Sequence, residues 1–418
     1  MSLTAPLPAT FHRLAWSNLA AQCAEQVALA AAPLAAVLLL GAGEGLSGLL
    51  QTALTLPFLL LAVPAGLLAD RMPRRRLMAS AEVLRALALA LIVTLIATGQ
   101  LTMAALAGLG FVSVCGTVAF SVAAPALVPA LVAPAAFAAA NARIELARTV
   151  AFAGGPALGG LLVGWTGPAP AFALAAALSL VAARLLAGIA EPPRPRASGR
   201  RPLDEFRDGV RFVAAHPLLR PVFVTQLVFG TSFFVILAIF VPYALRHLQM
   251  SAAAVGTTLA MYGVGMMIGA LAATRLLRHV AFGTVVALGP LTGFAASALL
   301  ALTIIVPSAA LAASGFFLLG VGPILWVIST TTLRQAVTPP QMLGRVSAIN
   351  ILSYGARPLG AAIGAVVGAR FGAEACLCLA MAGFAVQAGY ILLSPAVTLA
   401  RQPDGHDAAA IPLRSKTP

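Results

Sequence analysis

Long apolar segments set the strongest limit on how this chain can fold. They recur along nearly all of its 418 residues, and each has about the 20 residues that an α-helix needs to cross a bilayer. Lipid offers no partners for backbone polar groups, so these segments must be helical, and no alternating ten-residue pattern suggests a barrel. The sequence therefore predicts an all-α membrane protein with twelve transmembrane helices, over residues 14–40, 46–69, 77–98, 101–124, 138–164, 169–190, 218–245, 252–275, 281–306, 308–333, 343–369 and 373–396.

Composition excludes a soluble protein of this size. Hydrophobic residues make up 61% of the chain and charged residues only 9%, with a mean hydropathy of +0.98. A soluble fold would need far more polar side chains to cover its surface. The segment before the first apolar run lacks the pattern of a cleaved signal peptide, so we expect that run to be a permanent span.

The net charge of +14 is explained by the membrane topology. We do not expect a nucleic-acid partner. Basic residues gather in short loops between apolar segments, as is typical of loops kept on the cytoplasmic side. Of the 26 Lys and Arg residues, only Arg246 and Arg370 fall in predicted outward loops. The asymmetry and the even number of spans predict that both termini are cytoplasmic.

The longest inward loop divides the chain into two halves. Residues 1–190 and 218–400 are each predicted to form a six-helix bundle, joined by a linker at 191–217 and followed by a cytoplasmic tail at 401–418. Within the linker, PLDEFRDGVRFVAA has apolar residues at helical spacing, which predicts a short amphipathic helix lying along the inner membrane surface.

The two halves look like copies of one another. A shift of 203 residues places Gly66 on Gly269 and Arg75 on Arg278. Internal duplication is typical of transporters in which one half rocks against the other. The second copy has Ala273 where the first has Asp70.

The loop after the second span, GLLADRMPRRRLM, concentrates charge in an otherwise apolar chain. Its arginines, Arg71, Arg74, Arg75 and Arg76, are explained by the topology alone. Acidic residues contribute little to topology, so Asp70 needs another reason.

These motifs resemble those of a known family. GLLADRMPRRR resembles the loop motif of the major facilitator superfamily, and AGGPALGG at 153–160 resembles the Gly-Pro motif often seen in its antiporters. AEQVALAAAPLAAVLLLGAG, FRDGVRFVAAHPLLRP and LRQAVTPPQMLGRVSA are similar to the bacterial exporter branch that includes the enterobactin exporter. The resemblance runs from about residue 11 to 395. It implies two pseudo-symmetric six-helix bundles in a bacterial inner (plasma) membrane.

The resemblance also implies a gate at the cytoplasmic side. Asp70 would act as a conformational latch against the N-terminal end of the eleventh span, near Gly344 and Arg345, with Arg71 and Arg75 beside it. A carboxylate near a helix N-terminus gains about 0.3–1 kcal/mol, enough to bias two conformations.

Glu25 is the strongest candidate for coupling to protons. It lies eleven residues into the first span, about 16 Å deep, and a charge there is costly without a function. Asn18, Gln22 and Glu25 share one helix face, and Gln26 is adjacent, so this polar stripe should face an aqueous cavity. Glu25 would exchange protons as that cavity alternates; the alternative is an acid that only bonds two helices.

Arg357 lies near the middle of the eleventh span, where the resembling branch is usually uncharged. It could anchor a substrate anion, pair with Glu25, or bind carbonyl groups freed by Pro358. The sequence leaves these three roles open.

Two further acid–base pairs have helical spacing. Glu82 and Arg85 in the third span and Glu145 and Arg148 in the fifth are each three residues apart, which predicts local ion pairs near the cytoplasmic ends. The second pair could also reach Arg334 or Gln335 in the tenth span and shape an inner gate.

The Gly-Pro motif predicts a pliable helix. Gly155, Gly159 and Gly160 permit close packing, and Pro156 removes a backbone hydrogen bond. Packing alone would account for the glycines, whereas a hinge would serve rocking.

We therefore expect a monomeric secondary transporter that exports a small amphipathic molecule in exchange for protons. Proton-coupled uptake, uncoupled facilitation and a non-transporting receptor are the alternatives. An enzyme, a metal or another cofactor is not expected, because no nucleophile–base pair, metal cluster or phosphate loop is present. The candidate cavity walls are Phe58, Phe120, Phe229, Phe233, Phe234 and Trp326.

Overall fold

The computed structural model describes residues 8–133, 136–190, 202–339, 342, 346 and 353–401, and in these ranges its regular structure is helical. Eleven of the described helices are long and apolar enough to cross a membrane. The last of them is two helices joined at Gly372, which match the eleventh and twelfth predicted spans, so the prediction of twelve transmembrane helices is confirmed. The predicted start of the eleventh span, at 343–352, lies outside the described residues except for residue 346. The long helices are α1 (Ala9–Leu40), α2 (Glu44–Arg71), α3 (Arg74–Ala97), α4 (Met103–Leu131), α5 (Phe137–Thr166), α6 (Pro168–Ala187), α8 (Leu219–Arg246), α9 (Ala252–His279), α10 (Phe282–Leu302), α11 (Ala309–Val337) and α13 (Ala356–Leu392).

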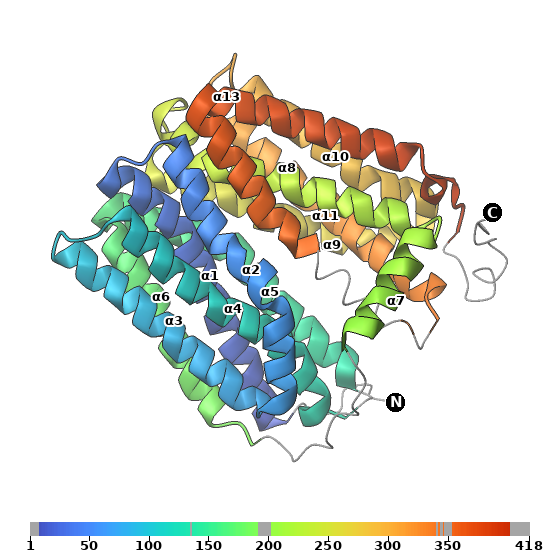
Figure 1. The fold of residues 1–418 in the computed structure, drawn as a ribbon, viewed down its shortest axis with the longest axis horizontal. Coiled ribbons are helices and arrows are strands. Elements are labelled where there is room, and N and C mark those ends of the chain that lie inside the picture. Colours follow the sequence, from blue (N-terminus) through green and yellow to red (C-terminus); the bar gives the residue numbers. More distant parts are fainter. Residues whose placement is uncertain are drawn as a thin grey trace.

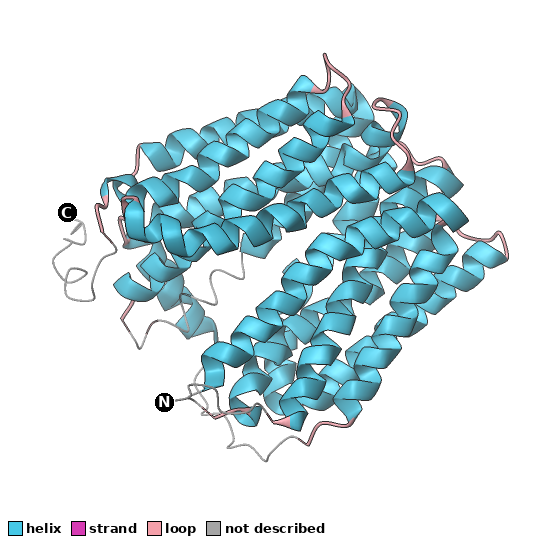
Figure 2. Cartoon of the chain, turned by 180° about the vertical axis from the view of Figure 1, so that it is seen from behind, coloured by secondary structure: helices cyan, strands magenta, loops and turns pink. Residues whose placement is uncertain are grey.

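The helices form two bundles that lie side by side (Figure 1; Figure 2 shows them from behind). Helices α1–α6 make the first bundle and α8–α13 the second. Three short helices complete the described chain: α7 (Pro202–Ala215), η2 (Ser353–Gly355) and η3 (Pro395–Thr398). The inner end is here the one at which α1 and α3 begin, which the sequence predicts to be cytoplasmic.

A shared backbone break supports the internal duplication. Gly167 ends α5 with φ 83° and ψ 176°, and Gly372 breaks α13 with φ 81° and ψ 176°. This left-handed φ is costly for any residue with a Cβ, which explains the glycine at both places. The two positions are 372 − 167 = 205 residues apart, close to the offset that aligns the two halves.

The hydrophobic core shows where the bundles are joined. One large cluster takes residues from both bundles in their outer halves, including Val37 of α1 and Phe240 of α8. Two smaller clusters lie toward the inner end. One, around Phe11, belongs to the first bundle, and the other, around Phe282, belongs to the second. Burial of apolar surface therefore holds the bundles together at the outer end and each bundle separately at the inner end.

Small residues form the seams between the bundles. A Cβ on Gly160 of α5 would stand 2.6 Å from Cα of Gly256 in α9, and one on Gly48 of α2 would stand 2.5 Å from Cα of Ala365 in α13. No ordinary side chain fits at such distances. The seams α5–α9 and α2–α13 are equivalent under the pseudo-symmetry of the two halves, so the two contacts repeat one packing solution.

The amphipathic helix predicted in the linker corresponds to α7. Val213 is buried in the inner core of the second bundle, whereas Val210 is exposed. The side chains of Leu203 and Phe206 lie outside the described residues. At Val213, α7 therefore packs against protein, and its expected position along the membrane surface stays a prediction.

Candidate functional site

The polar stripe of α1 has a buried part and a partly exposed part. Asn18 is buried, and its Nδ2 donates to the carbonyl of Ile144 in α5 at 3.2 Å. Gln26 is buried where α1 crosses α5 at Gly155. Gln22 and Glu25 are only half-buried. Asn18 and Gln26 therefore fasten two helices of the first bundle, and the exposed part of the stripe is confined to Gln22 and Glu25.

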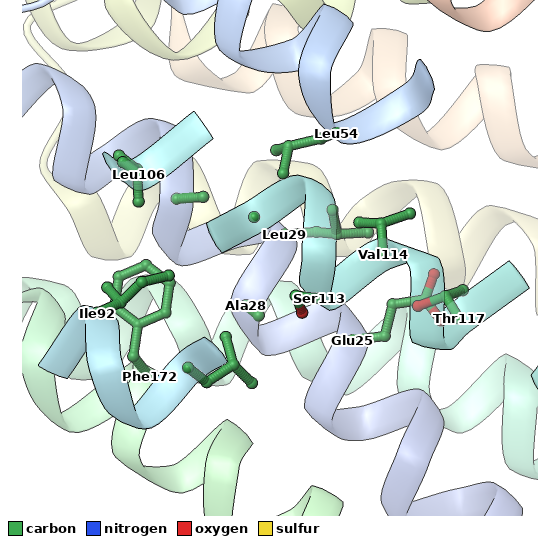
Figure 3. Close-up of a pocket in the computed structure, with 13 residues that line it drawn as sticks. Glu25, Ala28, Leu29, Leu54, Ile92, Leu106, Ser113, Val114, Thr117 and Phe172 are labelled. Carbon is green, nitrogen blue, oxygen red and sulfur yellow. The ribbon is translucent and has the colours of Figure 1, made fainter. Parts of the chain in front are cut away.

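Glu25 lies at one end of a pocket inside the first bundle (Figure 3). The space is about 350 Å³, counted with its open side, and its walls come from α1, α2, α3, α4 and α6. Most wall residues are apolar, among them Leu54, Ile92 and Phe172, and only Glu25, Ser113 and Thr117 add polar side chains. The pocket is thus a mainly apolar space in which one carboxyl group is the single ionisable lining group.

A buried ion pair stands next to this pocket. Glu82 and Arg85 of α3 are 0% and 1% exposed, and Nη1 of Arg85 lies 3.0 Å from Oε1 of Glu82. Arg85 also donates to the carbonyl of Ala21 at 3.1 Å and to Oγ1 of Thr117 at 2.7 Å. The predicted ion pair is confirmed, but it is sealed within the bundle at the depth of Glu25 rather than placed near the cytoplasmic end.

Arg357 of α13 lies among aromatic rings from both bundles. Its Cζ is 4.7 Å from the ring centre of Phe58 in α2, 5.7 Å from that of Phe234 in α8 and 4.3 Å from that of Tyr354 in η2. No carboxylate of the described residues lies within 4.0 Å of it, and no hydrogen bond joins it to them. Cation–π contact, worth about 0.5–2 kcal/mol, is therefore its observed interaction.

Direct pairing of Arg357 with Glu25 and binding to freed carbonyl groups are thus absent among the described residues. The charge of Arg357 still acts on Glu25, together with the charges of Arg85, Glu82 and Arg148. The guanidinium of Arg357 is half-buried, and it makes no hydrogen bond with a described residue. Arg357 could therefore still bind a substrate anion.

Arg148 of α5 completes this central group. It forms the predicted local ion pair with Glu145, and its Cζ lies 5.8 Å from the ring centre of Phe152. Its charge interacts with Tyr262 and Tyr354 of the second bundle. Arg334 donates to Thr331 on its own helix at 3.4 Å, so the proposed contact between it and the Glu145 pair is not seen.

Aromatic side chains near these arginines contact one another within and across the bundles. Phe152 of α5 contacts Tyr262 of α9 with ring centres 6.3 Å apart, and Tyr262 contacts Phe233 at 5.3 Å. Phe233 stacks in turn with Phe229 at 5.6 Å. We call Glu25, Phe58, Arg148, Phe234, Tyr262, Tyr354 and Arg357 the central site.

Two candidate cavity walls are elsewhere. Trp326 is 4% exposed and belongs to the inner core of the second bundle, where it packs against Gly289 of α10. Phe120 is 3% exposed in the inner core of the first bundle. Each side chain packs against helices of its own bundle, because the faces of α4 and α11 that carry Phe120 and Trp326 point into those bundles. Their assignment to the substrate cavity is corrected accordingly.

The Gly-Pro motif serves two contacts at once. Gly155 and Gly159 face α1, at Gln26 and Val27, whereas Gly160 faces Gly256 of α9. Pro156 lies within α5, and its carbonyl also approaches Gly256. The glycines are thus explained by close packing on two sides, and a hinge at this point stays a prediction.

The gate residues are only partly described. The side chains of Asp70 and Arg71, and all of Arg345, lie outside the described residues. Nη1 of Arg75 donates to the carbonyls of Ala187 and Ile189, at 3.1 and 3.0 Å, beside the C-terminus of α6. Arg75 therefore satisfies carbonyl groups of its own bundle.

No group of three or more His, Cys, Asp or Glu side chains comes together as a metal site in the described ranges. The sequence missed Thr117 and the proximity of Arg85 to Glu25. The sequence did contain a clue to this proximity: charged side chains such as Glu82 and Arg85 cost more to insert deep in an apolar span than near its end.

Comparison with known proteins gives one family over nearly the whole chain. The family model described as "Transmembrane secretion effector" matches residues 1–411. An uncharacterized MFS-type transporter, y4rN of Sinorhizobium fredii, is 32% identical over 257 residues, which cover 58% of this chain and 60% of the relative. The enterobactin exporter EntS of Escherichia coli is 30% identical over 197 residues, 46% of this chain and 45% of the exporter. The matched segments thus span only about half the length of these relatives.

Solved structures show the same fold at low identity. The nucleoside transporter NupG superposes with a TM-score of 0.71 at 12% identity, covering 92% of this chain and 98% of that one. A bacterial homologue of the iron transporter ferroportin, in an inward-facing state, has a TM-score of 0.73 at 15% identity, with 92% and 98% covered.

Proposed function

The chain belongs to the transmembrane secretion effector family of major facilitator superfamily transporters, and from this membership we propose that it exports a small amphipathic molecule in exchange for protons. It is a multi-pass membrane protein of a type that moves small molecules. The proposal adds the direction, the coupling to protons and the residues. We further propose that the protein is a monomer in the lipid bilayer of the bacterial inner membrane, that both termini are cytoplasmic, and that it has no nucleic-acid partner.

The position of Glu25 is the observation that carries the proposal. It is the ionisable group of the pocket, it is half-buried, and it forms no hydrogen bond or ion pair with a described residue. A carboxyl group that is shielded from water yet unpaired is free to gain and lose a proton as its surroundings change. Arg85, Arg148 and Arg357 lie near enough to act on that equilibrium.

The way in which the two bundles meet supports the proposal of alternating access. They share one hydrophobic core in their outer halves and have separate cores at the inner end. We infer that this arrangement opens the central site to the cytoplasm. In the opposite arrangement the outer seams would part and the inner ends would close, with Asp70, Arg71, Arg75, Glu145, Arg148 and Arg345 in the closing contacts.

Export is favoured over uptake by the relatives, since one of them is named an exporter. The cargo would lie against the aromatic rings of the central site, with Gln22 and Arg357 as polar contacts. Gly155, Pro156 and Gly159 would let α5 bend. Uptake with protons and uncoupled facilitation are the alternatives.

The test is proton flux in vesicles. Purified protein is reconstituted with a trapped pH dye, and a panel of amphipathic cations, anions and neutral aromatic compounds is added. Exchange predicts proton movement opposite to that of a transported compound, and this movement is lost in Glu25→Gln. The matched control is Glu374→Gln, an exposed carboxyl group in the second bundle.

The other outcomes separate the alternatives. Proton movement in the same direction as the compound would mean symport, and transport without proton movement would mean facilitation. Binding without transport would indicate a receptor. Unchanged exchange in Glu25→Gln would remove Glu25 from the mechanism.

A further inference from the structure

The buried pair beside Glu25 is imperfectly matched. Arg85 lies 3.0 Å from Oε1 and 3.1 Å from Oε2 of Glu82, but among the described residues Oε1 has no hydrogen-bond partner. Ser179 of α6 lies near this carboxylate. Buried ion pairs are most stable when each of their polar atoms is satisfied, and Oε1 of Glu82 faces Arg85 without a well-aligned hydrogen bond.

Arg85 also reaches the helix turn that carries Glu25. Its Nη1 bonds the carbonyl of Ala21, and residues 21 and 25 are one helical turn apart on the same face of α1. Its Nη2 bonds Thr117, which lies with Glu25 at the same end of the pocket (Figure 3). The guanidinium of Arg85 is thus bound one helical turn from Glu25 on α1.

We propose that the charge of Arg85 acts on two carboxyl groups, the paired Glu82 and the unpaired Glu25, and that Glu82 thereby acts as a positioning residue that sets how firmly Glu25 holds its exchangeable proton. The proposal rests on the proposed role of Glu25 and adds two residues to it. While Glu82 is ionised, it cancels most of the charge of Arg85, and Glu25 keeps its proton. The proton passes between the Glu25 carboxyl group and water, and Arg85 stays protonated throughout.

Other charges reach Glu25 from the remaining helices. They are Arg148 of α5 and Arg357 of α13, both on the side of the central site. Neither forms an ion pair with Glu25 within 4.0 Å in the described chain. They change surroundings when the bundles rock, whereas Glu82 and Arg85 stay inside one bundle. Glu82 and Arg85 therefore exert a constant effect on proton binding by Glu25, to which the movement of Arg148 and Arg357 adds a changing one.

The test needs no known cargo. The carbonyl stretching band of protonated carboxyl groups is followed by infrared spectroscopy during a pH titration of the protein in lipid, and the part lost in Glu25→Gln is assigned to Glu25. In Glu82→Gln, Arg85 is left to Glu25, so the midpoint of this band should fall by about one pH unit or more. In the double variant Glu82→Gln, Arg85→Gln, both charges are gone, and the midpoint should return close to that of the wild type.

Thr94→Ala is the matched control, because the Thr94 hydroxyl on α3 bonds only Ala90 of its own helix. An unshifted midpoint in Glu82→Gln overturns the sharing of Arg85, and so does an equal shift in the double variant. If Glu82→Gln does not fold, Arg85→Gln alone is the second variant: it removes the cation and leaves the Glu82 carboxylate, so the midpoint should rise relative to the wild type and Thr94→Ala, and an unshifted midpoint overturns the proposal. The band is measured without transport, so a shift in Glu82→Gln with normal proton exchange in Glu25→Gln would reject the proposed function and keep this inference.

Discussion

Arg246 in the second bundle is hydrogen-bonded to Ala42 in the first. Its Nη2 donates to the carbonyl of Ala42 at 2.9 Å and to that of Gly41 at 3.0 Å, at the outer end of the molecule. Gly41 ends α1 with φ 63°, and the turn that follows presents its carbonyl groups to the second bundle. Arg246 is thus a polar link across an end that is otherwise closed by apolar packing.

Replacing Arg246 with alanine should favour opening of the outer end. The loss of an exposed charged hydrogen bond is worth about 1 kcal/mol, which is about fivefold in the ratio of the two conformations. Spin labels on Gln100→Cys and Ile305→Cys, in a background without the four native cysteines, would report the distance between the outer loops. Arg370→Ala removes the other outward arginine and should leave the distances unchanged. Equal distributions in the two variants would contradict the link.

The seam between α5 and α9 should not tolerate a methyl group. Gly160→Ala would force a Cβ to within 2.6 Å of Gly256, and overpacking of this kind costs about 1–3 kcal/mol. The same labels should then show a larger outward-open fraction. Gly154→Ala is the control, because a Cβ there meets no atom within 4 Å. If both variants keep the wild-type distances, the seam is not closely packed in solution.

His216 should make the junction of α7 and α8 sensitive to acid. Its Nδ1 accepts hydrogen bonds from the backbone of Leu218 and Leu219, at 3.2 and 3.4 Å. Burial lowers the pKa of His216, so the folded protein favours the neutral ring that can accept these bonds. This stabilisation is present above the unfolded-state pKa of about 6.5 and is lost as the pH falls through the lower folded-state value.

Thermal unfolding measured from pH 8 downward tests this expectation. The wild type should lose stability on acidification, by about 1 kcal/mol if the lost contact resembles a helix cap. His216→Asn offers a neutral oxygen acceptor and should lose less over the same range. His279→Gln, at an exposed position, should follow the wild type. Parallel curves for His216→Asn and the wild type would contradict the assignment.

The contacts of Arg357 depend on a flat cation. Lysine keeps the charge but cannot stack on Phe58, Phe234 and Tyr354 together. Arg357→Lys should therefore weaken cargo binding about fivefold, as expected for about 1 kcal/mol of lost cation–π contact. Arg357→Gln should weaken it further. The measurement is the apparent KM of a compound identified in vesicles, and a lysine variant equal to the wild type would leave charge alone as the requirement.

Much of the fold was predictable because the bilayer imposes it. Apolar length alone located the twelve spans, and loop charges and repeated motifs divided them into two bundles. The sequence did not show which helix covers a given residue. Asn18 finds its partner at Ile144 in α5, and Trp326 is covered by α10, since these contacts depend on how separate helices cross. Polar spacing identified Glu25, but the approach of Arg85 from α3 needed the packed bundle.

The most direct measurement is proton release by the purified protein when a transported compound is added in weakly buffered solution. Exchange at Glu25 requires that cargo and proton exclude each other, so the wild type should release about one proton per bound cargo at a pH well below the one at which Glu25 is half protonated. Glu25→Gln should bind the compound and release none. Release of the same amount by Glu25→Gln, or uptake of a proton by the wild type, would contradict exchange at this residue.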